Sequence, residues 1–508
     1  MIRPLPLVAL ALCLLGGPAL AQDDGARVLP SMQERQAAFG EIDEAIKAGQ
    51  AAQAADMLLA LTQDPAHVAF HAEAWARLGA FIEKQGYPYA ALSAYAQALS
   101  TDADMVSSVA KDALRLADQV GDTALLEPVF AKNVGIDVDP ATRGRVAYLA
   151  ARRAHAEGSH GTAVAFLKMV PGDSPVYADA KALEGVVLAH TGRYDDAVTS
   201  LQIALAAGAS KEQAERWAVL MNLDLARAYF GAGEFVRAIE YFAKVPRSSP
   251  WWAQAQFERA WAHFRLDDLN GTLGLLRTHS SPFFSQEYFP EAALLEIYSL
   301  FLLCKFPAAG QQIDAFTVRF QPMLTDLQAV TAYPPAEAFE RARDAVLDGK
   351  TDRLPMMVAR PFLGEARFAA AAGTVVTLDA ERGRLDGASG AWADQARQWL
   401  DARHRTLVEV EGGRVLDRAR AMEAELSGML DNAEMNKLDI LQMEARMYER
   451  ASYTGVMETA KKTVDREVRV KQGYRLWPYE GEYWADEVGW FRVDTKAECP
   501  ESMRSGGG

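Results

Sequence analysis

The 508-residue sequence predicts an all-α protein, in which an array of helical hairpins precedes a long-helix region and a small aromatic-rich tail. Two observations predict this fold class. Small and large apolar residues recur in one frame about every 34 residues between 35 and 325. A second helical pattern, without that period, then runs from about 391 to 465.

The N-terminus has the features of a secretory signal. Arg3 precedes an apolar stretch over 5–15, and the small residues at 19 and 21 suit signal peptidase. We expect cleavage after Ala21, which makes 1–21 a signal peptide and 22–34 a lead into the repeats, with a periplasmic or secreted mature protein. A membrane anchor is the alternative, but the apolar stretch is too short. Cys13 follows Leu12 rather than a small residue, so lipidation is not favoured.

The clearest repeat unit begins at residue 72. Its first helix carries Trp75, Leu78, Gly79 and Ile82 on one face, and its second carries Ala91, Tyr95 and Ala98 after a turn at Gly86. The small residues Gly79 and Ala91 allow the two helices to approach closely, while Trp75 and Tyr95 fill the space around them. A hairpin of this kind cannot bury its apolar face alone, so neighbouring units are expected to stack.

This set of positions resembles the tetratricopeptide (TPR) family, whose 34-residue unit is two antiparallel helices. The frame recurs, because Ala163 and Ala197 are separated by 34 residues, as are Ala238 and Thr272. The resemblance implies a TPR-like α-α superhelix, or solenoid, over 35–325.

We expect about seven units, with six to eight as the range. The units at 35–68, 106–140 and 289–322 match the frame only in part, and a longer loop near 206–211 accounts for one wide interval. An α-solenoid of another type is the alternative.

The resemblance also implies a concave groove, lined by the first helix of each hairpin, that binds a protein partner. Carried onto this sequence, the inward positions are Leu223, Arg227, Phe230, Phe257, Trp261, Phe264 and Arg265. Aromatic residues and arginine are the types that dominate interface energetics. Packing between helices is the alternative role for Trp261 and Phe264.

After the repeats, 326–363 reads as a connecting helix at 336–347 and a linker rich in glycine and proline. The following segment, 364–465, reads as a helical hairpin or a coiled coil. Gly412 and Gly413 are expected to interrupt its long helix, since glycine costs about 1 kcal/mol relative to alanine in a helix interior.

The tail, 466–508, concentrates aromatic and acidic residues. We expect a small β-like or irregular lid that packs on the long helix, and a sugar- or peptide-binding surface is the alternative. The candidate surface residues are Trp477, Tyr479, Tyr483, Trp484 and Trp490. Cys304 and Cys499 could pair in an oxidising compartment. A buried, unpaired Cys304 is the favoured interpretation.

Catalytic and cofactor motifs are absent from the sequence. The 8 histidines are scattered along the chain, and metal-binding, redox, phosphate-binding and nucleophile-elbow motifs are missing. A net charge of -15 argues against nucleic-acid partners. We therefore predict no enzyme, no cofactor and no metal, and no stable membrane insertion after signal cleavage. The predicted function is a protein-interaction scaffold in a cell-envelope machinery. A glycan- or peptidoglycan-binding module, acting through the aromatic tail, is the alternative.

Overall fold

The computed structural model describes residues 31–102, 106–135, 138–284, 287–350, 352–363, 365–454 and 481–499. The predicted signal peptide, Trp477 and Tyr479 lie outside these ranges. Within them the regular structure is helical, and none of the helices combines the length and apolarity needed to span a bilayer.

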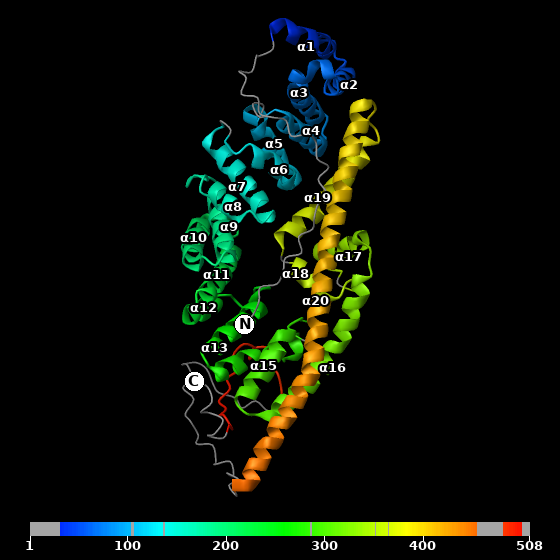
Figure 1. The fold of residues 1–508 in the computed structure, drawn as a ribbon. Helices are drawn as coiled ribbons and strands as arrows, with labels where there is room; N and C mark the ends of the chain where they lie inside the picture. The colour runs from blue at the N-terminus through cyan, green and yellow to red at the C-terminus, as the bar shows by residue number, and fades with distance from the viewer. Residues whose placement is uncertain are drawn as a thin grey trace.

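The helices α1 to α16 pair into eight consecutive hairpins, one more than the seven expected and within the predicted range. The pairs are α1 (Met32–Lys47) with α2 (Ala51–Leu61), α3 (His71–Lys84) with α4 (Pro88–Thr101), α5 (Val106–Val120) with α6 (Glu127–Lys132), α7 (Pro140–Ala156) with α8 (His160–Leu167), α9 (Tyr177–His190) with α10 (Tyr194–Ala207), α11 (Ala214–Gly231) with α12 (Phe235–Phe242), α13 (Trp252–Arg265) with α14 (Leu269–Leu276), and α15 (Pro290–Leu302) with α16 (Phe306–Thr331). The chain is thus a TPR-like helical solenoid (Figure 1).

Close approach of the two helices in a hairpin has the predicted cause. A Cβ atom added to Gly79 would lie 3.1 Å from the ring of Tyr95 and 3.3 Å from the carbonyl oxygen of Ala91. The same relation recurs at Gly185, where an added Cβ would lie 3.2 Å from the carbonyl oxygen of Ala197. Alanine at either position would push the second helix away, which explains the small residues of the repeat frame.

Each hairpin turns through one residue in the left-handed region. In six hairpins that residue is glycine, with φ between 75° and 84°: Gly49, Gly86, Gly121, Gly158, Gly192 and Gly233. The last two hairpins place Asp267 (φ 57°) and Cys304 (φ 54°) there instead. Because a side chain is strained in this region, glycine is the usual choice. The repeat frame therefore extends through the weakest predicted unit, 289–322.

The segment expected to be a linker contains a further helix. After α17 (Pro335–Asp348), the chain forms α18 (Met356–Leu363), then α19 (Ala366–Leu385). Pro355 directly precedes α18, a position where its missing N–H costs nothing, and Met357, Val358 and Phe362 are buried. Burial of this apolar face outweighs the helix-breaking tendency of the two prolines, so the linker prediction was wrong for these residues.

The long helix α20 runs without interruption from Ala391 to Thr454 (64 residues). Gly412 does not break it, although an interruption was predicted. A Cβ atom on Gly412 would lie 2.0 Å from the carbonyl oxygen of Pro335, whereas nothing lies within 4 Å of a Cβ on Gly413. Gly412 therefore allows the start of α17 to lie directly against α20.

The solenoid is an arc, and α20 connects its two ends (Figure 1). The first three hairpins, the last hairpin and the four helices α17, α18, α19 and α20 share one continuous hydrophobic core. At the N-terminal end, Trp392 packs edge-on against Phe81, with ring centroids 5.3 Å apart, and Trp399 lies 5.6 Å from Trp75. Burial of these large rings contributes to holding α20 against the first hairpins.

Two buried polar contacts hold the same end. Arg403 of α20 donates Nε–H and an Nη–H to the carboxylate of Asp122, at 2.8 and 2.9 Å. Glu381 of α19, fully buried, accepts the backbone N–H groups of Tyr89 and Ala90 at 2.9 and 2.8 Å. The Glu381 carboxylate thus caps α4 from a distant helix and satisfies two donors that the first turn leaves unpaired.

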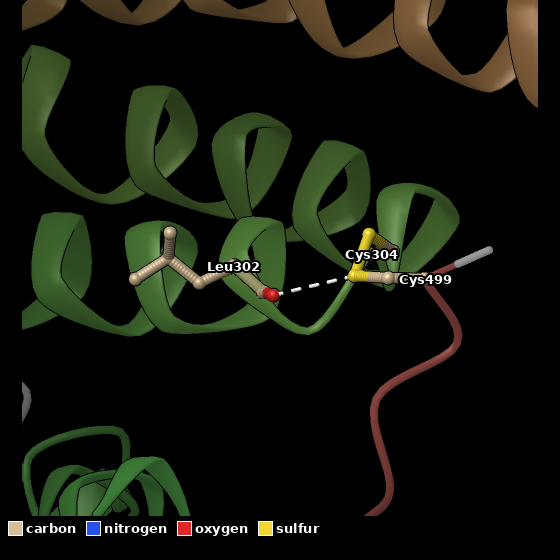
Figure 2. The surroundings of a disulfide bond; sticks show 3 residues. All are labelled: Leu302, Cys304 and Cys499. Atoms are coloured by element: carbon tan, nitrogen blue, oxygen red, sulfur yellow. Dashed lines mark hydrogen bonds between the residues drawn. A yellow bond between two sulfur atoms is a disulfide. The ribbon is translucent and has the colours of Figure 1, made fainter. Parts of the chain in front are cut away.

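Residues 481–499, which we call the strap, have neither helix nor strand and pack on the solenoid. The tail was expected on the long helix, so this expectation was wrong for the described part: Val488 lies in a core cluster with Trp252 of α13. The strap ends in a disulfide between Cys499 and Cys304, with Cα atoms 5.0 Å apart (Figure 2). The favoured interpretation of Cys304 as an unpaired core cysteine was therefore also wrong.

Candidate partner-binding site

A cavity of about 380 Å³ lies between the C-terminal half of the solenoid and the helices α18 and α20. Its lining residues come from α11, the start of α13, the approach to α15, α18 and the middle of α20: Arg227, Pro250, Trp251, Ala253, Gln254, Glu287, Tyr288, Phe289, Met357, Arg360, Pro361, Leu363, Arg418 and Met422. The cavity exists because α18 and α20 face the solenoid across this gap.

Three guanidinium groups and one carboxylate line the cavity. Arg227 donates two hydrogen bonds to Glu258, at 2.8 and 2.6 Å, and Arg360 forms an ion pair with Glu287. Two of the three guanidinium groups are therefore paired with carboxylates. Arg418 is exposed, and its charge acts on the neighbouring Tyr288 and Glu291.

Aromatic and methionine side chains form the walls. Tyr288 donates a hydrogen bond from its hydroxyl to the backbone carbonyl of Met422 at 3.1 Å. This bond links the segment before α15 with α20. Burial raises the pKa of Tyr288, so the hydroxyl stays protonated and remains a donor. The nearby Glu291 also has a raised pKa, first through burial and then through the charge of Glu425.

The lining combines apolar side chains with arginines and one glutamate. No histidine, cysteine, serine, threonine or lysine is among the described residues that line the cavity. Its one carboxylate, Glu287, is neutralised by Arg360, and burial raises the pKa of Glu287 while Arg360 lowers it. Apolar walls with guanidinium groups at the rim fit an apolar side chain that lies next to a carboxylate.

Of the residues predicted to line the groove, Arg227 faces this cavity. Leu223 and Phe257 are buried in the core. The aromatic pair Trp261 and Phe264 packs edge-to-face, with centroids 5.6 Å apart, against the cluster that contains Phe257.

Phe230 and Arg265 both contact the ring of Phe235 on α12. The Phe230 and Phe235 centroids are 5.2 Å apart, and Arg265 Cζ lies 4.7 Å from the Phe235 centroid. The predicted set is therefore divided among a cavity, two core clusters and this contact, rather than forming one continuous lining.

The described residues of the predicted C-terminal surface are Tyr483, Trp484 and Trp490. Tyr483 packs edge-to-face on Phe491 within the strap, with centroids 5.7 Å apart. Trp484 and Trp490 are 58% and 61% exposed. Glycan binding by this segment stays a prediction.

The histidines are less scattered than the sequence suggested, because three of them meet at the junction of two hairpins. His155 ends α7, His160 begins α8 and His190 ends α9, with ring centroids 4.8 to 6.4 Å apart. His155 and His190 lie within one position of each other in the 34-residue frame of successive units, which could have indicated this. Among the described residues, no group of three or more His, Cys, Asp or Glu side chains has a geometry that could hold a metal ion.

The contributions of α18 and α20 to the cavity were also missed. Arg360 and Arg418 carry no sequence signal of their own, since each lies in an amphipathic helix where an arginine is ordinary. Their role depends on α20 packing against the solenoid, which the repeat frame does not describe.

No protein-family model and no curated protein matches the sequence. Among solved structures, similar chains include the apo form of RapI (11% identity, TM-score 0.35, covering 75% of this chain and 98% of that chain). A Rap protein complexed with competence and sporulation factor has 12% identity and a TM-score of 0.29, covering 78% of this chain and 99% of that chain. Cut9–Hcn1 of the APC/C has 14% identity and a TM-score of 0.21, covering 78% and 83%. Because these TM-scores are low, no function is transferred from these proteins.

Proposed function

We propose that this chain is an exported interaction scaffold, without catalytic activity, that serves a cell-envelope machinery. Its partner protein inserts an acidic segment into the cavity between the solenoid and α18 and α20. The observation that carries the proposal is the exposed guanidinium of Arg418, which lines an aromatic-walled cavity together with Arg227 and Arg360. Guanidinium groups bind carboxylates bidentately, and aromatic walls bury an adjacent apolar side chain.

Two features support export. The residues at 1–21 have the pattern of a cleavable secretory signal. The disulfide between Cys304 and Cys499 is of a kind that persists in oxidising compartments and is rare in the cytosol. The charge balance supports a protein partner over a nucleic acid, because a chain with net charge -15 repels phosphate backbones.

Charge reversal at the rim tests the cavity. Arg418→Glu places a carboxylate where the partner's acid should bind, so we expect loss of the partner from crosslinking followed by mass spectrometry in the native cell. Arg405→Glu is the matched control, since Arg405 is an exposed arginine on the same helix that does not line the cavity. The melting temperature should change little in either variant, because neither side chain is buried.

Two outcomes of the crosslinking experiment would contradict the proposed binding site. If the partner crosslinks equally to the wild type, Arg418→Glu and Arg405→Glu, the cavity is not the binding site. If both variants lose the partner, the interaction depends on overall charge rather than on this rim.

A further inference from the structure

The strap forms a turn over 485–489 and then crosses the last hairpins without regular structure, and the solenoid holds it largely by its backbone. Asn270 at the start of α14 donates Nδ2–H to the carbonyl of Thr495 at 3.2 Å, and the Thr495 N–H donates to Asn270 Oδ1 at 3.0 Å. The Glu498 N–H donates to the Leu303 carbonyl at 2.9 Å. One side-chain amide thus satisfies both backbone groups of a single strap residue.

A second backbone contact lies near the other end of the strap. Arg247, in the loop before α13, donates Nη–H groups to the carbonyl oxygens of Ala485 and Asp486, the latter at 3.1 Å. Both carbonyl groups belong to the turn over 485–489, so this contact recognises the backbone of that turn and does not depend on the side chains that it carries. The backbone contacts would hold any segment that follows the same path.

Two close approaches restrict which segment fits. Val488 is 1% exposed and packs with Trp252, and a Cβ atom on the next residue, Gly489, would lie 2.4 Å from the Trp252 ring. On the solenoid side, a Cβ on Gly274 of α14 would lie 2.7 Å from the carbonyl oxygen of Phe491. The surface therefore selects an apolar residue followed by glycine.

Charge and a covalent bond fix the end of the strap. Lys305 Nζ lies 2.7 Å from Glu498 Oε1, and Cys499 is bonded to Cys304 in the turn between α15 and α16. Figure 2 shows this end of the strap reaching the turn, with Cys499 Sγ 3.5 Å from the carbonyl oxygen of Leu302. The noncovalent contacts would remain if the disulfide were reduced.

We propose that the surface under the strap is a binding track for a segment of a partner protein that follows the same path, a turn and then an extended stretch, and that the strap is a built-in competitor for it. The track is defined by Arg247, Trp252, Asn270, Gly274 and Lys305. The partner segment carries an apolar residue followed by glycine and, about ten residues later, a carboxylate, as Val488, Gly489 and Glu498 do.

The disulfide locks the competitor in place. Opening requires a dithiol donor: its two thiols reduce the Cys304–Cys499 bond to two thiols, and the donor becomes a disulfide, so electrons and protons balance. With the lock closed, the effective concentration of the strap excludes a partner; with the lock open, a partner at sufficient concentration displaces it.

The track is separate from the cavity described above. Trp251 lines the cavity, whereas its neighbour Trp252 lies under the strap, so consecutive residues at the start of α13 serve two surfaces. The proposal therefore does not depend on what the cavity binds.

A full-length variant with an incompetent strap makes the track accessible. Cys499→Ser removes the lock, and Val488→Asp places a charge where the strap must bury an apolar side chain. The probe is a fluorescent peptide of residues 481–499 carrying Cys499→Ser. Binding is measured by fluorescence anisotropy. We expect this peptide to bind the double-variant protein at least tenfold more tightly than a control peptide that also carries Val488→Asp. We expect no binding of the peptide to the oxidised wild-type protein.

Two glycine substitutions locate the binding. Added to the double variant, Gly274→Ala should weaken peptide binding at least tenfold, because its Cβ would occupy the position of the peptide backbone. Gly310→Ala in α16 is the matched control, since nothing lies within 4 Å of its Cβ. Equal effects of the two substitutions would contradict the proposed track.

The proposal fails if the double variant shows a cooperative melting transition but binds neither peptide, or binds both equally. If the double variant does not fold, Cys499→Ser alone supplies the test by hydrogen exchange. Excess peptide must then accelerate exchange of the protein's own residues 485–499, and unchanged exchange would overturn the proposal.

Discussion

Gly412 and Gly413 are neighbours in α20 that should respond oppositely to the same substitution. Gly413→Ala should raise the free energy of unfolding by up to about 1 kcal/mol, because alanine is the better helix former and its Cβ meets no neighbour. Gly412→Ala should lower it by about 1 to 3 kcal/mol, because its Cβ would overlap the carbonyl oxygen of Pro335. Urea denaturation of the two variants measures the difference. Stabilisation by both would mean that α17 does not lie against α20 at this point.

The sequence predicts the structural role of some single residues and not of others. Gly79 and Ala91 were predicted to allow close helix packing, because glycine and alanine at fixed spacing have a steric meaning that survives in any unit. Cys304 has no such meaning by itself. It occupies a turn position that six earlier hairpins give to glycine, and its partner Cys499 lies 195 residues away. Only the path of the strap reveals that pairing.

The contact between the hairpin α7–α8 and the helix α9 should depend on pH through the histidine cluster. Burial, followed by the charges of His160 and His190, lowers the pKa of His155 below its ordinary value of 6.5. The unfolded chain takes up this proton near the ordinary value, whereas the folded chain resists it. Stability that is present above about pH 6.5 is therefore lost as the pH falls.

His155→Gln should remove part of this loss. When the pH is lowered from 7.5 to 5.5, we expect the melting temperature of the variant to fall less than that of the wild type. His404→Gln is the control, because His404 lies on α20 outside the cluster and faces Asp379 at 3.4 Å. A recovery of the same size in both variants would show that the pH dependence does not arise at this junction.

The elements could be predicted more fully than their arrangement. Hairpins and the long helix follow from periodicity within about 15 to 35 residues, which a sequence displays directly. The helix α18 was missed because Pro355 before it and Pro361 within it are read as breakers, while the burial of Met357 and Phe362 that stabilises it depends on distant helices. The candidate cavity was missed for the same reason, apart from Arg227.

In the whole molecule, closure of the arc depends on a buried ion pair. The side chains of Arg403 and Asp122 are 18% and 4% exposed. Arg403→Leu leaves the Asp122 carboxylate buried without its cation, which should cost about 3 to 5 kcal/mol of stability. We also expect a larger maximum dimension in small-angle X-ray scattering, because α20 loses its hold on the first hairpins.

The double variant Asp122→Asn/Arg403→Leu is the matched comparison. It removes the buried charge together with its partner, so it should recover more than 1 kcal/mol and return the scattering profile towards that of the wild type. If the double variant is as unstable and as extended as Arg403→Leu, the loss comes from packing rather than from an unpaired carboxylate.

Closure by α20 also sets the order in which the chain folds. Each hairpin contacts its immediate neighbours, so the arc can form from local contacts, one unit upon another. Two hydrogen bonds that dock α20 span long stretches of the chain. Arg403 and Asp122 are 281 positions apart, and Trp392, whose N–H donates to Asp56 Oδ1, is 336 positions from that residue. Contacts between residues so far apart in the sequence form slowly. We therefore expect the last stage of folding to start from an open arc whose faces around Trp75 and Phe81 are still exposed to water. That intermediate, rather than the finished protein, is the form most prone to aggregate and most in need of a chaperone.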